Sequence, residues 1–242
     1  MPSTRPGFTA LVSKTVARIR ARGPGEVIRT WLRIARQLAS SDERLIFYYR
    51  NLDPELELVE GPRLDGATFR EADVNDAARY ARDIGTDSAA TFAARLSADT
   101  HCFVVVDNET FLHASWVTTA AAWTRELQRY FCPPPNDAYV YESFTRAETR
   151  GRGIYPFALR SICAWLAGGD LTGVWVGVED GNEPSLRAVS KAGFRTGFSI
   201  DYGRRLGRLT VEPPHGPAAG GNHGFLRTTP DCLREEHFGP KG

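Results

Sequence analysis

The 242-residue chain lacks several features that would each indicate a class of function. Its four cysteines show no C-x-x-C spacing, which argues against zinc binding and thioredoxin-like chemistry, so we expect no metal site. No apolar run reaches about 18 residues, so we expect no membrane span. Residues 1–22 lack the apolar core of a signal peptide, which favours a cytoplasmic protein. The net charge of +1 does not favour a nucleic-acid partner.

Charge and composition divide the chain into three zones. Residues 1–60 are a basic extension, since residues 1–50 hold ten Lys or Arg against three Asp or Glu, a charge of +7. Residues 61–212 alternate strand and helix patterns, which predicts one α/β domain. Residues 213–242 are rich in Pro, Gly and His and predict a flexible tail.

The basic extension contains one clear helical pattern. Apolar residues recur between Glu26 and Ala39 with a period of about 3.6 residues, which predicts an amphipathic helix. Such a helix either lays its apolar face on the domain or contacts a membrane surface, an acidic partner or an acyl-carrier protein. The run from Arg44 to Arg50 is strand-like instead.

Within residues 61–212, apolar periodicity and turn residues predict the order of the elements. Asp73 and Ser88 are expected to cap the first two helices. The expected strands are 67–70, 102–106, 111–117, 138–145, 174–178, 194–202 and 208–212, and the expected later helices are 157–167 and 185–192.

An Arg/Gly stretch, TRGRGIYP from Thr149 to Pro156, joins the expected strand 138–145 to the expected helix 157–167. Glycine takes positive φ and lets the backbone approach a ligand closely. The N–H groups of a first helical turn have no intrahelical partner, and the helix dipole favours an anion there. The stretch therefore predicts a pyrophosphate-binding loop, although a Gly-rich turn often only connects elements.

A second motif, NEPSLRAVSKAGF from Asn182 to Phe194, follows the expected strand 174–178. The two motifs together resemble motifs A and B of the GNAT superfamily of acyl-CoA N-acyltransferases. The loop of that family is Gln/Arg-x-x-Gly-x-Gly/Ala, and its second motif is Asn-x-x-Ala/Ser with a Lys-x-Gly-Phe-like helix end. The resemblance covers roughly residues 66–205. It implies an α/β GNAT fold, with a mixed central sheet, flanking helices and a splay between strands 138–145 and 174–178.

The resemblance implies acetyl-CoA or CoA as the ligand. The loop would donate backbone N–H groups to the pyrophosphate, and the strand end at the splay would pair with the pantetheine arm and stabilise an oxyanion. The start of the second motif would lie near the thiol. The alternatives are that the asparagine caps the helix and that the serine lies on its solvated face. The matching positions are Arg150, Gly151, Arg152, Gly153, Ile154 and Tyr155 in the loop, Phe144 and Thr145 at the strand end, and Asn182 and Ser185 in the second motif.

Two positions depart from the family pattern. Tyr155 stands where the loop of the family has Gly or Ala, so the helix start or the seating of CoA is expected to differ. Val189 stands where many members carry a tyrosine that protonates the leaving thiolate. A thiolate with a pKa of roughly 8.5 can leave without a dedicated acid, so this departure does not exclude activity.

Glu142 is the candidate general base. Strand alternation places Val140, Glu142 and Phe144 on one face, where burial would raise the pKa of the carboxyl group. The alternative is a structural carboxylate bonded to a neighbouring strand or an arginine. His113 is a second candidate, although a histidine in the middle of a strand is more often part of the core or rim.

The stretch 118–137 is longer than a hairpin needs and contains Trp123, which we expect to contact the acceptor substrate. The alternative is a hairpin that packs on a second subunit of a homodimer. The sequence thus predicts an N-acetyltransferase that moves an acetyl group from acetyl-CoA to a primary amine of a small molecule such as an amino sugar, amino acid or antibiotic. Two alternatives stay open: a longer-chain acyltransferase that uses acyl-CoA or acyl-carrier protein, and a non-catalytic CoA-binding module.

Overall fold

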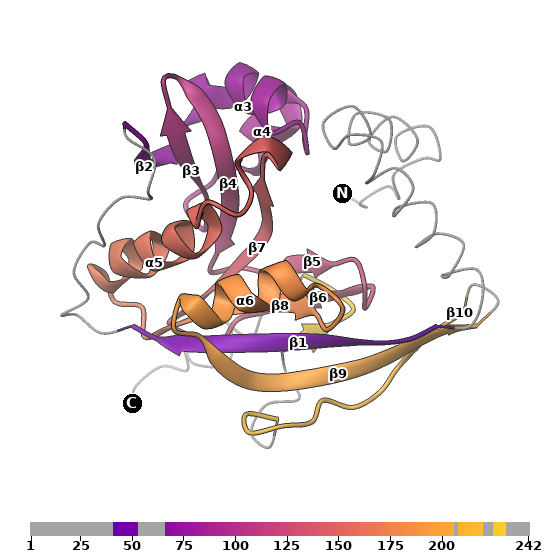
Figure 1. Ribbon diagram of the computed structural model, residues 1–242. Coiled ribbons are helices and arrows are strands. Elements are labelled where there is room, and N and C mark those ends of the chain that lie inside the picture. Colours follow the sequence, from indigo (N-terminus) through magenta and orange to yellow (C-terminus); the bar gives the residue numbers. More distant parts are fainter. Residues whose placement is uncertain (1–40, 53–65, 206–207, 220–224, 231–242) are drawn as a thin grey trace, which may run out of the picture.

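An eight-stranded mixed sheet forms the centre of the computed structural model, which describes residues 41–52, 66–205, 208–219 and 225–230 (Figure 1). The strand order is β10-β9-β1-β8-β7-β4-β3-β2. The strands of this sheet are β1 (Ser41–Asn51), β2 (Thr68–Ala72), β3 (Thr100–Asp107), β4 (Thr110–Thr118), β7 (Asp137–Thr145), β8 (Gly173–Glu179), β9 (Arg195–Arg205) and β10 (Arg208–Val211).

The helices begin where the sequence places cap residues. Asp73 caps the short 3-10 helix η1 (Val74–Asp76), which leads into α3 (Ala77–Asp83), and Ser88 caps α4 (Ala89–Arg95) by accepting a hydrogen bond from the N–H of Thr91. The longer helices are α5 (Ile154–Ala167) and α6 (Glu183–Lys191), and a second 3-10 helix, η2 (Ala147–Thr149), precedes α5. Every helix among the described residues is too short or too polar to cross a membrane.

Strand β1 lies inside the sheet although it comes from the basic end of the chain. It pairs antiparallel with β8 on one side and with β9 on the other. The strand-like run 44–50 is therefore confirmed, and it joins β9 and β10 to the rest of the sheet. The expected helix 26–39 and the expected domain boundary at residue 60 lie outside the described residues.

Both faces of the sheet are covered. Helices α5 and α6 lie on one face, where Val140 packs with Leu159 and Val189 (Figure 1). On the other face, α3 and α4 pack over β3 and β4 through Phe92 and Trp116. In the strand order, β8 and β7 are the two middle strands of the sheet.

The long stretch 118–137 forms part of a small second sheet. Strands β5 (Ala122–Thr124) and β6 (Arg129–Phe131) pair with each other, and β6 pairs with β11 (Leu226–Arg227). The ring of Phe131 is fully buried and stacks on Phe47 of β1 at a centroid distance of 4.7 Å. The stretch therefore packs on its own domain, and the preceding Phe225, in the expected tail, is also buried in this cluster.

Strands β7 and β8 run parallel and then separate. They pair from Asp137 with Gly173 to Val140 with Val176, and the remaining residues of β7 pair only with β4. The expected splay is therefore present and begins after Val140. It leaves one edge of the end of β7 without a strand partner among the described residues.

A β-bulge interrupts β7 within the splay. The register with β4 shifts between Ala114 and Trp116, whose partners are Phe144 and Tyr141. Glu142 lies in the bulge with φ of 47°, in the left-handed region that a non-glycine residue rarely adopts. The bulge adds one residue to β7, so the alternation of side chains changes there.

The prediction that Val140, Glu142 and Phe144 share one face is wrong because of this bulge. Val140 packs under α5, whereas Phe144 packs on the opposite face with the α3 and α4 cluster. The side chain of Glu142 is 36% exposed, so it is only partly buried.

Candidate functional site

A cleft of about 2080 Å³ opens where β7 and β8 separate. Its walls come from the second half of β7, the end of β8, the loop before α5, and α6. Further lining residues belong to α4, β1, β9 and the β5–β6 hairpin. The splay, the Arg/Gly loop and the second motif therefore meet in one cavity.

The Arg/Gly loop has the backbone conformation that its glycines predict. Gly151 and Gly153 have φ of +80° and +79°, and Gly153 is the N-cap of α5. A Cβ at either glycine would meet no atom within 4 Å, so the positive φ, and not lack of space, favours glycine. Helix α5 begins at Ile154, three residues earlier than expected, so the N–H groups of Ile154 and Tyr155 belong to the first turn and suit an anion.

The two arginines of the loop differ in position. The Nε of Arg150 donates a hydrogen bond to the backbone carbonyl of Thr145 at 3.1 Å, and its guanidinium lies 5.9 Å from the centre of the Phe144 ring. Arg150 thereby joins the loop to the end of β7 and lines the cleft, whereas the exposed Arg152 is not among the lining residues.

Tyr155 fits the loop because its ring turns back under the sheet. The ring stacks on that of His113 at 5.4 Å, and its hydroxyl bonds to the side chain of Ser143. Burial raises the pKa of Tyr155, so the phenol is neutral at ordinary pH. The bulky residue thus occupies space between β7 and α5, and Pro156 follows in the first turn, where no N–H is needed.

The second motif opens α6 beside the cleft. The side chain of Asn182 caps the helix by accepting a hydrogen bond from the N–H of Ser185 at 3.4 Å, as the structural alternative predicts. Both residues also line the cleft. Val189 is fully buried in the core, so this position of α6 presents no acid to the cleft.

His113 lies in the core. Its Nδ1 is 2.7 Å from the Thr145 hydroxyl and its Nε2 is 2.8 Å from the Ser115 hydroxyl, so both ring nitrogens have partners. Burial lowers the pKa of His113 to about 3, and the ring is not among the residues that line the cleft. This placement matches the core histidine that the sequence favoured over a catalytic one.

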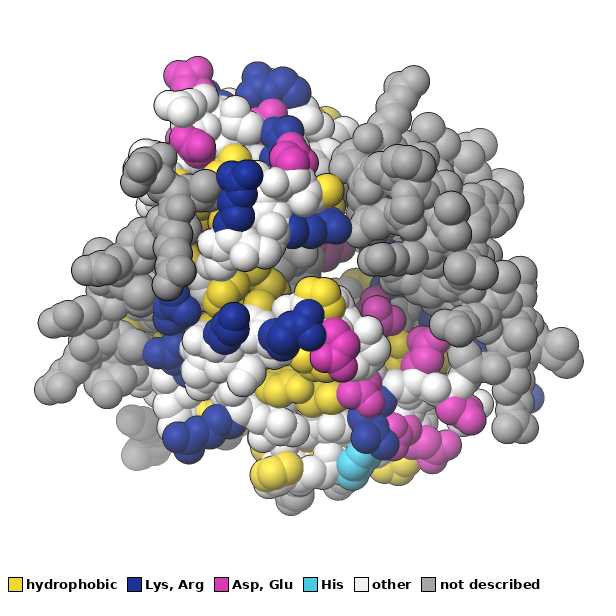
Figure 2. Space-filling model, viewed as in Figure 1, with side chains coloured by type: hydrophobic (Ala, Val, Ile, Leu, Met, Phe, Trp, Pro, Cys, Tyr) yellow, Lys and Arg dark blue, Asp and Glu magenta, His cyan; other side chains and the backbone are white. Residues whose placement is uncertain are grey.

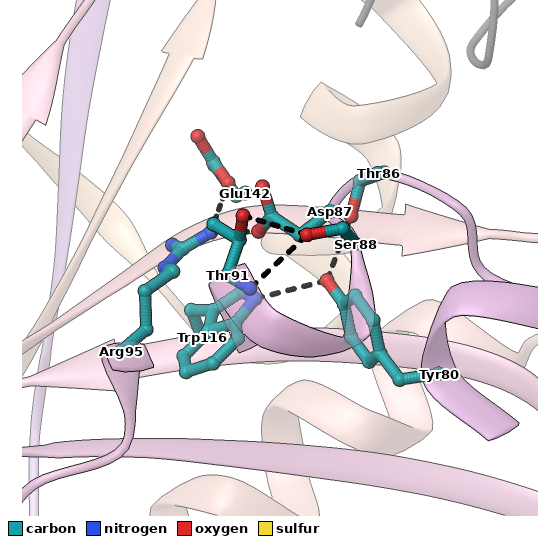
Figure 3. Close-up of polar contacts among 8 residues, drawn as sticks. All are labelled: Tyr80, Thr86, Asp87, Ser88, Thr91, Arg95, Trp116 and Glu142. Atoms are coloured by element: carbon teal, nitrogen blue, oxygen red, sulfur yellow. Dashed lines mark hydrogen bonds and ion pairs between the residues drawn. The ribbon is translucent and has the colours of Figure 1, made fainter. Parts of the chain in front are cut away.

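Glu142 projects from the bulge toward α4. Its Oε2 accepts a hydrogen bond from Nη1 of Arg95 at 2.7 Å (Figure 3). Arg95 also pairs with Asp87, whose side chain is only 4% exposed. Glu142 is therefore bonded to an arginine, which is the alternative to a general base given by the sequence. Its side chain also lines the cleft.

A second acidic group lies across the splay, on β1 and β8. The hydroxyl of Tyr202 on β9 donates to Oε2 of Glu43 at 2.7 Å and lies 3.4 Å from Oε1 of Glu179. Burial and the bond to Glu43 raise the pKa of Tyr202, so it stays protonated between the carboxylates.

The charges that line the cleft are unevenly distributed. On the loop and α6 the lining charges are positive, whereas carboxylates outnumber arginines around β1, β9, the bulge and the β5–β6 hairpin. Figure 2 shows several acidic side chains gathered at the lower right of this face, with a basic side chain among them. An anionic ligand suits the first side and a cationic ligand the second. The lining cations are Arg44, Arg95, Arg125, Arg150, Arg187 and Lys191, and the lining carboxylates are Asp42, Glu43, Asp87, Glu126, Glu142, Glu179, Asp180, Asp201 and Glu212.

Trp123 lies at the acidic side of the cleft. Its side chain is 49% exposed, and its ring packs edge-on against Tyr130 at 4.9 Å. An exposed indole that lines a cleft is available as an apolar contact for a ligand.

Sequence reasoning missed the residues that surround Glu142 and the second acidic group. Arg95 is far from Glu142 along the chain and belongs to a different element, and Glu43 belongs to the basic extension. Only the pairing of strands and the docking of α4 bring these residues to the cleft, and no sequence motif signals either event.

No protein-family model and no curated protein sequence matches the chain. Among solved structures, a GCN5-related N-acetyltransferase from Sphaerobacter thermophilus matches with a TM-score of 0.50 and 12% identity, over 76% of this chain and 56% of that one. A protein assigned to the GNAT acetyltransferase family from Novosphingobium aromaticivorans matches with a TM-score of 0.46 and 15% identity, over 71% and 64%. An aminoglycoside acetyltransferase from an uncultured soil metagenomic sample, solved with sisomicin, matches with a TM-score of 0.43 and 10% identity, over 53% and 88%.

The match to the Sphaerobacter structure, at a TM-score of 0.50, shows a shared fold. The chain has the GNAT fold that its two motifs predicted, at an identity too low to show a shared activity. It spans less than two thirds of the length of the first two structures, with 56% and 64% of them matched.

Proposed function

We propose that the protein is an N-acetyltransferase that moves an acetyl group from acetyl-CoA to a primary amine of a small molecule. One observation carries the proposal: a glycine-rich loop at a helix N-terminus, the part of β7 that separates from β8, and a carboxylate line the same cleft. These are the three parts that a CoA thioester and an amine would need. The GNAT fold supports the proposal at the level of architecture.

The donor side of the proposal rests on the loop and β7. The N–H groups between Gly151 and Tyr155 would bind the diphosphate of acetyl-CoA, with added charge from Arg150. The edge of β7 that separates from β8 beyond Val140 would hydrogen-bond the pantetheine amides as an added strand does. Phe144 and Thr145 would supply that edge, and Asn182 and Ser185 would face the thiol end from α6.

The acceptor side rests on charge. An amine arrives as an ammonium ion, and the carboxylates opposite α6 favour a cation. Trp123 would contact the apolar part of the acceptor. The acceptor class we propose is therefore an amino compound such as an amino sugar, an amino acid or an antibiotic amine.

Glu142 would accept a proton from the ammonium, directly or through a water molecule. The freed nitrogen lone pair would form a bond to the thioester carbonyl carbon, and a backbone N–H at the end of β7 would donate to the resulting oxyanion. When the oxyanion re-forms the carbonyl, the C–S bond breaks and the nitrogen loses its remaining extra proton to solvent. The thiolate, with a pKa of about 8.5, leaves without an acid, which agrees with valine at position 189.

The test is release of CoA thiol from acetyl-CoA in the presence of a panel of amines. We expect turnover with at least one amino sugar, amino acid or aminoglycoside, and a loss of about 10²-fold or more in kcat for Glu142→Gln. Glu148→Gln is the matched control, because Glu148 is exposed, pairs with Arg146 and does not line the cleft.

Each contrary result removes a different part of the proposal. Unchanged turnover by Glu142→Gln would refute the base assignment. Turnover of longer acyl donors but not of acetyl-CoA would refute the donor. Consumption of no thioester with any amine, despite CoA binding, would identify a non-catalytic CoA-binding module.

A further inference from the structure

Arg95 is the last residue of α4 and faces the bulge of β7 (Figure 3). Its Nη1 donates to Oε2 of Glu142 at 2.7 Å and also bonds to Oδ2 of Asp87. Its guanidinium carbon lies 4.0 Å from the centre of the Trp116 ring and 5.3 Å from that of Tyr141. The side chain is only 21% exposed, so the cation is held on several sides at once.

The groups that hold Arg95 are themselves fixed. The indole Nε1 of Trp116 donates to the hydroxyl of Tyr80 at 3.0 Å, and that hydroxyl is 2.7 Å from the hydroxyl of Thr86. Asp87 follows Thr86 directly and is nearly fully buried. The guanidinium therefore rests on a rigid surface of α3, α4 and β4 and presents its remaining side to Glu142.

Arg95 is the described ion-pair partner of Glu142. Glu142 lies in the bulge with φ of 47°, its side chain is 36% exposed, and its Oε2 bonds to Nη1 of Arg95. The ion pair with Arg95 joins the bulge to α4. The pair therefore fixes where the Glu142 carboxylate lies in the cleft.

The charge of Arg95 also affects the protonation of Glu142. A neighbouring cation favours the ionised form of a carboxyl group, and only the ionised form accepts a proton. Among the described residues, the other titratable groups near this carboxylate are Asp87, which opposes its ionisation, and Tyr141 on β7 itself. Burial raises the pKa of Tyr141, so it is neutral, and in this described group Arg95 is the cation.

We propose that Arg95 is a positioning residue for acetyl transfer, which orients Glu142 toward the acceptor amine and keeps it ionised. This inference rests on the proposed function, because it assigns Arg95 a role through the proposed base. Two variants separate the effect of Arg95 on the position of the Glu142 carboxylate from the effect of its charge. Arg95→Lys keeps the charge but loses the planar contact with Trp116 and the shared bonds, whereas Arg95→Met keeps much of the apolar stem and loses both.

The experiment measures kcat and KM from pH 5 to pH 9 by thiol release with acetyl-CoA and the best amine of the panel. For Arg95→Met we expect the acidic limb of kcat/KM to move up by about one pH unit and kcat at its plateau to fall about tenfold or more. For Arg95→Lys we expect a lower kcat with the acidic limb near its original pH. The KM for acetyl-CoA should stay within about twofold in both variants, because Arg95 does not touch the Arg/Gly loop.

Arg82→Met is the matched control, since Arg82 is an exposed arginine of α3 that pairs with Asp83 and does not line the cleft. It should leave the kinetic constants unchanged. Circular dichroism of every variant checks folding. An acidic limb that does not move in Arg95→Met, or an equal loss in both Arg95 variants without a change in pH profile, overturns the proposal.

A second readout does not depend on turnover. Carboxyl ¹³C NMR of glutamate-labelled protein follows the titration of Glu142, which is assigned by the resonance that Glu142→Gln removes. We expect that resonance to titrate at higher pH in Arg95→Met than in the unmodified protein. An unchanged titration overturns the inference about Arg95, whereas a shifted titration in a protein that acetylates no amine overturns the proposed function and supports the coupling of the two residues.

Discussion

Phe47 is a fully buried side chain of β1, the strand that comes from the basic extension. Its ring stacks between Phe131 and Phe198 with centroid distances of 4.7 Å to each. Phe47→Ala removes the whole ring. Truncation of a buried phenylalanine costs about 3–5 kcal/mol, because the lost transfer free energy adds to the cavity that remains. The two stacked neighbours place this site at the upper end of that range, at about 5 kcal/mol, since each aromatic pair adds about 0.5–1.5 kcal/mol beyond burial.

Urea unfolding of the full chain, followed by tryptophan fluorescence, measures this loss. We expect a lower midpoint with an unchanged slope, as for a change in stability without a change in the exposed surface. Arg44→Ala on the same strand is the control, because Arg44 is an exposed residue that pairs with Asp201, and its midpoint should not move. A loss below about 1 kcal/mol for Phe47→Ala would mean that β1 is not an integral strand of the sheet.

Two further predictions concern the loop and the buried histidine. Gly153→Ala should raise the KM for acetyl-CoA about tenfold, because an alanine at φ of +79° costs roughly 1–2 kcal/mol. Gly181→Ala is the control and should have little effect, because Gly181 lies in open space beside the same cleft. Equal KM values for the two variants would contradict the anion-binding conformation of the loop. Burial lowers the pKa of His113 to about 3, below its value of about 6.5 in the unfolded chain, so the unfolded state binds the extra proton as the pH falls. The free energy of unfolding should therefore drop by about 1.4 kcal/mol per pH unit below pH 6.5. Urea titration between pH 7.5 and pH 5 measures this dependence. A similar dependence of the free energy of unfolding on pH in His113→Gln would contradict a neutral buried ring.

The parts of the site that are local in sequence could be predicted. The positive φ of Gly151 and Gly153 and the caps at Asp73 and Ser88 depend on nearest neighbours along the chain, although α5 begins three residues before its expected start. The order of strands and helices in 61–212 follows from apolar periodicity in the same way. These elements carry the proposed donor side of the cleft.

The acceptor side could not be predicted, because it depends on contacts between distant segments. The bulge at Glu142 arises from the register with β4, and the alternation rule fails beyond Tyr141 for that reason. Strand β1 enters the sheet between β8 and β9, which apolar periodicity cannot reveal, since it does not specify pairing partners. The ion pair of Arg95 with Glu142 depends on both the bulge and the docking of α4.

A crystal structure of the protein with CoA bound would show whether the cleft between β7 and β8 is the donor site. We predict that the diphosphate accepts hydrogen bonds from the N–H groups between Gly151 and Tyr155. We also predict that the pantetheine arm runs along the edge of β7 beyond Val140 and that the sulfur lies beside Glu142. A CoA molecule bound outside the splay, or one whose sulfur points away from the bulge, would refute the proposed donor site.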